Sequence, residues 1–491
     1  MGHMPSLKTK TVHFGSLLFL YILIQTYKKH ICLQTVEIQK NPYRNVTKML
    51  QKYYKNITNT LDFLQKKIYY YIVKIKKMEE VFWLFGDIIV GIDIGTSKVA
   101  SVIAEINNFN QLEIIAIAEC KCFGMRKTKI TDEEEIASAI KKTIEEVEAQ
   151  SNIKINSAYV TIPGKYVQIV QNSIIKEAKD RFAGITSKDL NSAISQLRDI
   201  DIPEDKVIID IIKNQFALDN GRIVEDPVGA LSSTVTVTGQ VILANRDYVR
   251  QLTSIFKKAN IEIDGIVPNV LALRSLVLDV NEMNDNVMIL DIGAGNTDIG
   301  VFSGDNFIYS DTIPLGGDNI TSDIAQVFYI SEEEAYRLKK QYSLALKSFI
   351  DNDTDIMLTT YKGDEKNKTI KSSELIAVIE ARVEEIFTLV NKQITNLGIK
   401  SSINNVILTG QGITGISKSD VAGKIVLNIP VKIATGRMIS TIKPAYRSSY
   451  ALVRYASNRP FVKNVASKID IKSNESFVKT VMARIKEFFY T

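Results

Sequence analysis

Histidine is almost absent from this chain of 491 residues. The sequence contains only three, His3, His13 and His30. Everything after residue 30 therefore lacks an imidazole. This excludes Ser-His-Asp and Cys-His catalysis, and histidine-ligated metals, from the greater part of the chain.

Cysteine is equally scarce. Cys32, Cys120 and Cys122 are the three present, and their spacing gives neither a C-x-x-C pair nor an even framework. Such a pattern indicates free thiols in a reducing compartment rather than a zinc site or a fold built on disulfides.

Basic charge is also missing from most of the chain, although the overall net charge is +6. Residues 1–77 carry a net charge of +12, which leaves −6 for the remaining residues. A nucleic-acid partner for the main part of the protein thus has no support from charge, and we expect none.

No apolar run reaches the length of about 20 residues that a membrane-spanning helix needs. The longest near the N-terminus, residues 14–24, has eleven. We interpret residues 1–77 as a basic extension that is non-native or disordered, with Met78 as the expected native start. The alternative is a genuine basic segment that binds membranes.

Two strand–turn–strand patterns carry the same Asp-Ile-Gly sequence. An apolar run from residue 87 leads into Asp93-Ile94-Gly95-Thr96-Ser97, and a second strand follows over 99–106. The run at 286–290 likewise leads into Asp291-Ile292-Gly293-Ala294-Gly295, with a strand over 299–302. Alternating β-branched residues on either side of a glycine turn predict two β-hairpins.

The residues at these turns are those that phosphate binding requires. Glycines let backbone N–H groups approach a phosphate, and hydroxyl or amide side chains add donors. A carboxylate at the strand end would act through Mg²⁺ and its waters. We predict Asp93 and Asp291 as the magnesium ligands, mostly through water. The predicted phosphate-binding residues are Gly95, Thr96, Ser97, Lys98, Gly293, Ala294, Gly295, Asn296 and Thr297.

A third glycine motif, 410–415, follows the apolar strand 405–409 and fits G-x-G-x-x-G. A dinucleotide-binding fold would also need an acidic residue at the end of the next strand, about 20 positions on. The next strands are predicted over 424–427 and 431–434, and neither ends in Asp or Glu. No Walker A sequence is present either.

Two Asp-Ile-Gly loops followed by a strand ending in Thr-Gly-x-Gly resemble the superfamily of actin, heat-shock chaperone ATPases and sugar kinases. In that superfamily the first two loops hold phosphates and the third holds adenosine. A Gly-Gly turn at 316–317 is similar to the one that opens a helix towards the nucleotide. The resemblance implies ATP and Mg²⁺ as cofactors. It also implies an adenosine site formed by Gly316, Gly317, Glu334, Lys339, Gly410, Gln411 and Gly412.

Within the superfamily, the segment 214–230 (NQFALDNGR…DPVGA) is similar to that of the FtsA family of bacterial cell-division proteins. The resemblance implies an α/β, actin-like, two-lobed fold with a nucleotide cleft and an inserted SHS2-type subdomain 1C. The implied division is 78–162 and 240–280 for subdomain 1A, 163–239 for 1C, 281–319 and 398–435 for 2A, 320–397 for 2B, and 436–460 for the return to 1A.

The last residues form a separate pattern. After a polar linker at 461–475, residues 476–491 place their apolar side chains on one arc of a helix, with three basic residues opposite. A terminal amphipathic helix of this kind is typical of an interfacial membrane anchor. The predicted membrane-binding residues are Phe477, Val481, Met482, Ile485, Phe488 and Phe489.

Membership of the FtsA family would imply a protein that polymerises and tethers filaments of the tubulin-like protein FtsZ to the cytoplasmic face of the inner membrane at the division septum. The implied partners are the FtsZ C-terminal peptide, other divisome proteins and a second copy of the chain. Arg382 and Glu385 are candidate contacts for the peptide.

The expected ATPase activity is weak or absent, because Pro268 lies where actin has the glutamine that positions the attacking water. Two alternatives share the fold. One is a pilus-assembly scaffold of the PilM type, and the other is a small-molecule kinase.

Overall fold

The computed structural model describes residues 87–107, 111–179, 184–358, 368–435, 439 and 441–458. The basic extension 1–77, the linker 461–475 and the amphipathic helix 476–491 lie outside these residues, so those three predictions stay predictions. Within the described ranges, no helix is long and apolar enough to cross a bilayer.

The first five-stranded sheet has the order β11-β6-β1-β2-β3. Strand β1 runs parallel to β6, and β6 runs parallel to β11, whereas β2 and β3 form an antiparallel hairpin. The bounds are β1 Asp87–Ile94, β2 Lys98–Ile106, β3 Leu112–Lys121, β6 Ser157–Ile162 and β11 Glu262–Pro268.

The second sheet repeats this topology, with the order β18-β17-β12-β13-β14. Here β12 pairs antiparallel with β13 and parallel with β17. The bounds are β12 Asn286–Ile292, β13 Thr297–Ser303, β14 Asn306–Ile313, β17 Asn405–Thr409 and β18 Val431–Ile433. Both predicted Asp-Ile-Gly hairpins are confirmed, and each joins the first two strands of its own sheet.

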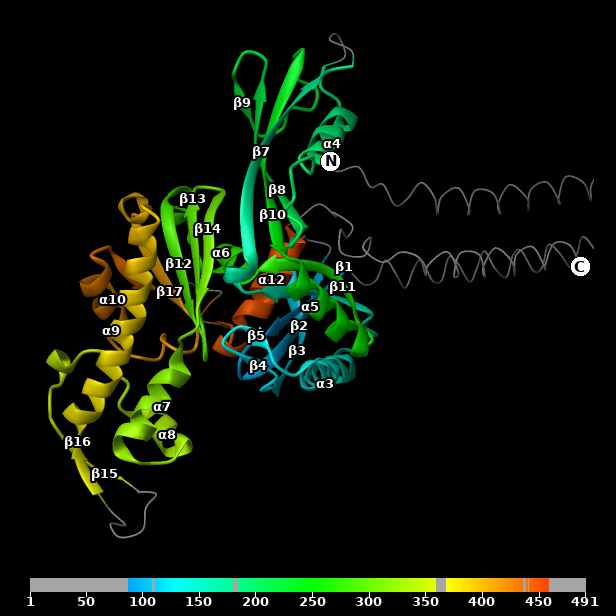
Figure 1. Ribbon diagram of the computed structural model, residues 1–491. Coiled ribbons are helices and arrows are strands. Elements are labelled where there is room, and N and C mark those ends of the chain that lie inside the picture. The colour runs from blue at the N-terminus through cyan, green and yellow to red at the C-terminus, as the bar shows by residue number, and fades with distance from the viewer. Residues whose placement is uncertain are drawn as a thin grey trace, which may run out of the picture. The chain divides into compact units, whose positions relative to one another are not determined.

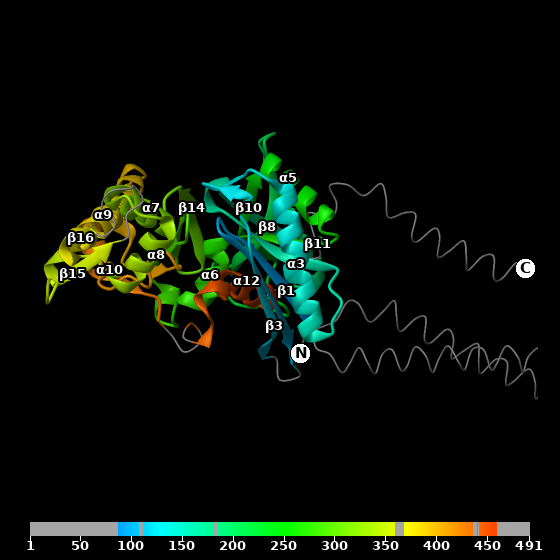
Figure 2. The ribbon, with the colours of Figure 1, turned by 90° about the horizontal axis from the view of Figure 1, so that it is seen from below.

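Helices cover both faces of each sheet. Helices α3 and α5 pack on one face of the first sheet, and Figure 2 shows α3 lying across it. Helices α6 and α12 share one core with the other face and with the second sheet. The bounds are α3 Glu133–Ser151, α5 Arg246–Lys258, α6 Asn269–Val277 and α12 Arg447–Ser457. The two sheets are therefore joined through a common hydrophobic layer.

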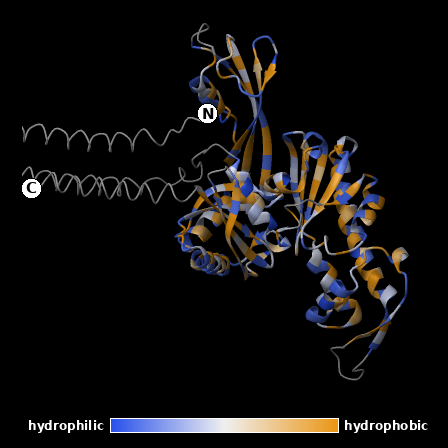
Figure 3. Ribbon diagram, turned by 180° about the vertical axis from the view of Figure 1, so that it is seen from behind, coloured by the Kyte–Doolittle hydropathy of each residue, from blue (hydrophilic) through white to orange (hydrophobic). Residues whose placement is uncertain are grey.

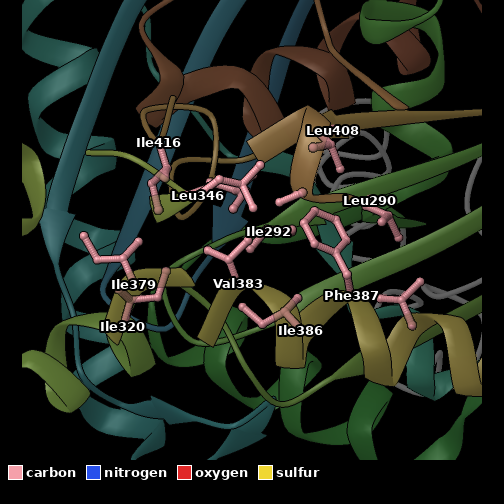
Figure 4. Close-up of a cluster of buried hydrophobic side chains, with 14 of the residues drawn as sticks. Leu290, Ile292, Ile320, Leu346, Ile379, Val383, Ile386, Phe387, Leu408 and Ile416 are labelled. Carbon is pink, nitrogen blue, oxygen red and sulfur yellow. The ribbon is translucent and has the colours of Figure 1, made fainter. Parts of the chain in front are cut away.

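The outer face of the second sheet is covered by α9 (Ser372–Asn396) and α10 (Ser419–Leu427). Alternate residues of β12 divide between the two faces: Met288, Leu290 and Ile292 face the outer core, while Val287 and Ile289 face the shared layer. This alternation explains why the strand reads as a continuous apolar run. Figure 3 shows the same apolar colouring along the sheet strands, and Figure 4 shows the outer core around Phe387.

An insertion between β6 and α5 forms the sheet β7-β10-β8-β9, with α4 packed on one face. The bounds are β7 Val167–Glu177, α4 Ser187–Gln196, β8 Lys206–Leu218, β9 Ile223–Val224 and β10 Thr234–Asn245. Figure 1 shows this unit standing beside the strand β14. The buried side chain of Gln240 donates to Phe307 O (2.9 Å) and accepts from Phe307 N (3.0 Å), so it pairs with the edge strand of the second sheet.

A smaller group of elements follows β14. Helix α7 (Gly317–Phe328) begins at the Gly-Gly turn, as the resemblance implied, and α8 (Glu332–Gln341) packs against it. The short hairpin β15 (Asp355–Leu358) and β16 (Lys368–Lys371) precedes α9. A two-stranded hairpin, β4 (Met125–Arg126) and β5 (Lys129–Ile130), lies between β3 and α3.

The strand predicted over 424–427 is wrong, because these residues end helix α10. A short apolar run has no period of its own to separate strand from helix. Here Gly423, in α10, decides the packing: a Cβ at this position would lie 2.9 Å from the ring of Phe387, so its absence lets the two helices approach.

Phe387→Ala should lower the free energy of unfolding by about 3–5 kcal/mol, because it empties a fully buried site between α9 and α10. The matched control is Phe349→Ala, at a side chain that is 43% exposed, and it should cost less than about 1 kcal/mol. Urea unfolding followed by circular dichroism measures both. Equal losses for the two variants would contradict the packing described.

Candidate functional site

The two Asp-Ile-Gly turns have the same backbone geometry. Gly95 N donates to Lys98 O at 2.9 Å, and Gly293 N donates to Asn296 O at 2.8 Å. Each bond closes a tight turn between the first two strands of its sheet. The matching topology of the two sheets therefore presents two equivalent loops.

The third glycine turn packs directly against the second loop. Gly412 N donates to Ile292 O at 2.8 Å, and a Cβ at Gly412 would lie only 2.1 Å from Gly293 O. Gly410 has φ of +96°, which favours glycine, and its Cβ would lie 2.3 Å from Ile292 O. Glycine is thus required at both positions because backbone occupies the space of a side chain.

The Gly-Gly turn at the start of α7 completes this group. Gly317 N donates to Gly293 O (2.9 Å), and Asp318 N donates to Ala294 O (2.7 Å). A Cβ at Gly317 would meet Gly412 Cα at 2.7 Å. Three of the predicted glycine segments therefore meet as bare backbone.

The first loop reaches this group across the two sheets. Gly295 N donates to Thr96 Oγ1 at 3.1 Å. Lys98 Nζ donates to Glu119 Oε2 (2.9 Å) and to Gln411 Oε1 (3.2 Å), which links the first loop to the third. The structure thus brings together the residues that the sequence places nearly 200 positions apart.

One predicted phosphate-binding side chain has a different role. Thr297 is fully buried, and its hydroxyl donates to Leu315 O at 2.8 Å. Thr297 therefore holds the second loop to the segment before α7 through its side chain.

The predicted magnesium ligand Asp93 lies at the end of β1. Its Oδ1 accepts a bond of 2.7 Å from Thr161 Oγ1, which the parallel neighbour β6 supplies. Burial raises the pKa of Asp93, while the bond from Thr161 and the charge of Lys98 oppose that rise.

The second carboxylate, Asp291, is paired with a third that the sequence prediction did not assign, Asp298. The side-chain amide of Asn269 donates to Asp291 Oδ2 (2.7 Å) and to Asp298 Oδ2 (3.2 Å). Asp298 also accepts from Thr312 Oγ1 and from Gly164 N. Burial raises the pKa of Asp291 to about 7, and Asp298 adds to this by repulsion; burial likewise raises the pKa of Asp298 to about 6.

These carboxylates fit a hydrated divalent cation. Among the described residues, no three acidic or cysteine side chains are arranged to hold a metal directly. Two buried amide oxygens, Asn269 Oδ1 next to the carboxylates and Asn296 Oδ1 in the second loop, have no hydrogen-bond partner among the residues that the structure describes. Such oxygens suit a group that carries protons, for example a metal-bound water.

Of the predicted adenosine residues on α8, Lys339 reaches the glycine group. Its buried Nζ donates to Gly317 O and to Thr321 Oγ1, both at 2.7 Å, and burial lowers its pKa to about 8. Glu334 is instead bonded to Arg337, at 2.7 and 2.8 Å. Lys339 therefore anchors α8 on α7, while Glu334 has a partner within its own helix.

The candidate peptide contacts on α9 are joined to neighbours within the fold. Arg382 makes two bonds to Asp323 of α7, at 2.6 and 2.8 Å, and a third to Glu385. Arg382 thus helps to hold α9 against α7, while Glu385 pairs with Arg382 within α9. Their role in binding a peptide stays a prediction.

Sequence reasoning missed Thr161, Asn269 and Asp298. Thr161 in β6 and Asn269 directly after β11 lie at the carboxyl ends of parallel strands of the first sheet, and Asp298 lies near the start of β13 in the second sheet. Side chains at the carboxyl ends of parallel strands converge, so Thr161 and Asn269 could have been found once the strand order was known. Asp298 closes the DIGAGNTD sequence and could have been found from that motif alone.

Two repeated sheets, each with a glycine hairpin aimed at a shared junction, define the class of the protein as actin-like. Family models support this and are more specific. The model "Cell division protein FtsA" matches residues 288–451, and the model "SHS2 domain inserted in FTSA" matches residues 164–243, which cover the insertion between β6 and α5. The chain belongs to the FtsA family.

The sequences of FtsA proteins from two bacteria align with most of the chain. It is 28% identical to the cell division protein FtsA of Bacillus subtilis over 396 residues, which cover 81% of this chain and 89% of that protein. It is 25% identical to FtsA of Escherichia coli K12 over 385 residues, covering 75% and 90%. Among solved structures, the PilM-PilN type IV pilus biogenesis complex aligns with a TM-score of 0.50 and 14% identity, over 76% of this chain and 99% of that one. This last similarity is evidence for the fold alone.

The raised carboxylate pKa values predict that the nucleotide-free protein loses stability as the pH rises from about 4 to about 7. An unfolded Asp titrates near 3.9, so the folded state holds more protons in this range, and its advantage is lost as the pH rises through about 6 to 7. The expected loss is roughly a few kcal/mol, since one pKa unit corresponds to about 1.4 kcal/mol.

Chemical unfolding at a series of pH values measures this dependence. Residues 87–458 contain no histidine, so no imidazole within them titrates in the same range. The control Asp291→Asn removes one of the two carboxylates and should flatten the profile. An unchanged profile in that variant would contradict the assignment.

Proposed function

We propose that the chain binds ATP with Mg²⁺ where the three glycine turns meet, and that the bound nucleotide favours actin-like polymers. The observation that carries this proposal is that all three glycine turns meet at one place. Gly295 meets Thr96, Gly412 meets Gly293, and the Lys98–Gln411 bond joins the remaining pair. Turns that pack this closely, with glycine at their contacts, let a polyphosphate approach the backbone, where many donors bind it at once.

The carboxylates support a role for Mg²⁺ beside the phosphates. Asp93, Asp291 and Asp298 would repel phosphate directly, and a hydrated cation between them would offset that repulsion. When bound, the cation would neutralise charge on the phosphates. This chain's own residues would orient it through the bonds from Thr161 and Asn269 to the carboxylates.

Hydrolysis is expected to be slow or absent. Pro268 ends β11 beside the carboxylates, and a proline has neither a side-chain acceptor nor a backbone N–H to position water. A general base must lie within hydrogen-bond reach of the attacking water. The nucleotide would thus act chiefly as a structural ligand.

The proposed role in the cell is to hold FtsZ filaments on the cytoplasmic face of the inner membrane at the division site and to help recruit other divisome proteins. Family membership supports a role in division. The predicted anchor is the helix 476–491, whose sequence places apolar residues on one arc. A single such helix binds reversibly, and a polymer adds avidity.

Gly412→Ala should weaken ATP binding by more than about tenfold, because the added Cβ collides with Gly293 O and pushes the third turn from the second loop. The matched control is Gly415→Ala in the same turn, where a Cβ meets nothing within 4 Å. Equilibrium dialysis with ATP and Mg²⁺ measures both, with circular dichroism to check folding. Equal affinities in the two variants would place the nucleotide elsewhere.

The membrane proposal is tested by co-sedimentation of the full chain with vesicles of phosphatidylethanolamine and phosphatidylglycerol. The double variant Phe488→Glu, Phe489→Glu should lose most of the pelleted fraction, because it places two charges on the apolar arc. The control Thr480→Glu, Ala483→Glu adds the same charge on the opposite side and should still pellet. Loss in both variants, or in neither, would overturn the anchor.

A further inference from the structure

The side chain of Asn269 is only half satisfied within the fold. It lies in the first turn of α6, is 7% exposed, and follows directly after Pro268. Its Nδ2 donates to Asp291 and Asp298, whereas its Oδ1 is buried and has no hydrogen-bond partner among the described residues.

The orientation of this amide follows from its neighbours. Both partners are carboxylate oxygens, which accept hydrogen bonds, so the NH₂ group and not the carbonyl must face them. Its two hydrogens are then used, one for each carboxylate. The remaining atom, Oδ1, is an acceptor, and a buried acceptor without a hydrogen bond is destabilising.

The surroundings restrict what can satisfy Oδ1. A partner must bring protons, and it must tolerate three nearby carboxylates. Lys98 interacts with Asp93, and Arg447 interacts with Asp291, which leaves fewer cations than carboxylates. A water bound to a divalent cation meets both conditions, because its protons are strongly polarised and its charge opposes the carboxylates.

We infer that Asn269 is a positioning residue for the hydrated cation, with its NH₂ group holding Asp291 and Asp298 and its Oδ1 accepting from a metal-bound water. This inference rests on the proposed binding of ATP with Mg²⁺, and it adds a direct contact of Asn269 Oδ1 with a water of the ion. It also gives a role to an amide immediately beside Pro268.

Two substitutions separate the acceptor from the donor. Asn269→Ala removes both, whereas Asn269→Asp removes the donating NH₂ but keeps an acceptor oxygen. The measurement is the affinity for ATP with Mg²⁺ and with EDTA, and the ratio of the two gives the enhancement by Mg²⁺. In the alanine variant the enhancement should fall about tenfold, which corresponds to the loss of one hydrogen bond to a polarised partner. The aspartate variant should keep the parent's enhancement or exceed it.

The matched control is Asn214→Ala. This amide also donates through Nδ2, to Asp305 O and Asn306 Oδ1, and also has a buried Oδ1 without a partner, but it lies beside the far end of the β13–β14 hairpin. In this variant the enhancement of ATP affinity by Mg²⁺ should equal that of the parent. This result would show that the loss of an amide alone does not change the ratio.

The outcomes are distinct. Opposite effects of alanine and aspartate support the inference, and thermal unfolding of both variants identifies any that fails to fold. Equal loss in the two variants would mean that only the donor matters, and no loss in either would mean that Asn269 does not reach the ion; each result overturns the inference while ATP binding stands. If the parent itself binds no ATP, the proposed function and the inference both fail.

Discussion

The structure depends on how closely the backbone of the third glycine turn approaches the second loop. Gly412 and Gly410 lie where a side chain would have to occupy the space of Gly293 O and Ile292 O. Because these backbone atoms belong to the last residue of the central strand β12 and to the residue that follows it, they cannot move without disturbing the end of the strand. Hydrogen bonds from Gly317 N to Gly293 O and from Asp318 N to Ala294 O then attach helix α7 to the second loop. The third turn, the second loop and the start of α7 are therefore held together at close contacts where glycine is needed.

The repeated topology explains why this junction lies between the two sheets. Each sheet presents its hairpin at the carboxyl end of its parallel strands, and α6 with α12 forms a core that both sheets share. A conformational change at the junction can thus be transmitted to both sheets. The insertion is joined to the second sheet as well, through Gln240 on Phe307 and through Gly164 on Asp298. The inserted sheet and the carboxylates consequently have a direct structural connection.

Much of this could be predicted from the sequence. The two Asp-Ile-Gly hairpins, the strand 405–409 and the helix after the Gly-Gly turn have strong local patterns, and the structure confirms them. Asn269 and Thr161 could not be assigned, because their role depends on which strands are neighbours, and no local pattern encodes strand order. The error at 424–427 has a similar cause, since a short apolar run takes its conformation from its packing against Phe387. The pairing of Arg382 with Asp323 likewise depends on how α9 packs against α7, which no local pattern encodes.

The central claim is that the three glycine turns together hold the nucleotide. Hydrogen–deuterium exchange of the full chain, with and without ATP and Mg²⁺, tests it most directly, because it reports on the backbone of each turn separately. The account predicts slower exchange on ATP addition in peptides that contain 94–98, 293–297 and 410–412 together. Protection confined to other segments, or protection of one turn without the others, would contradict it.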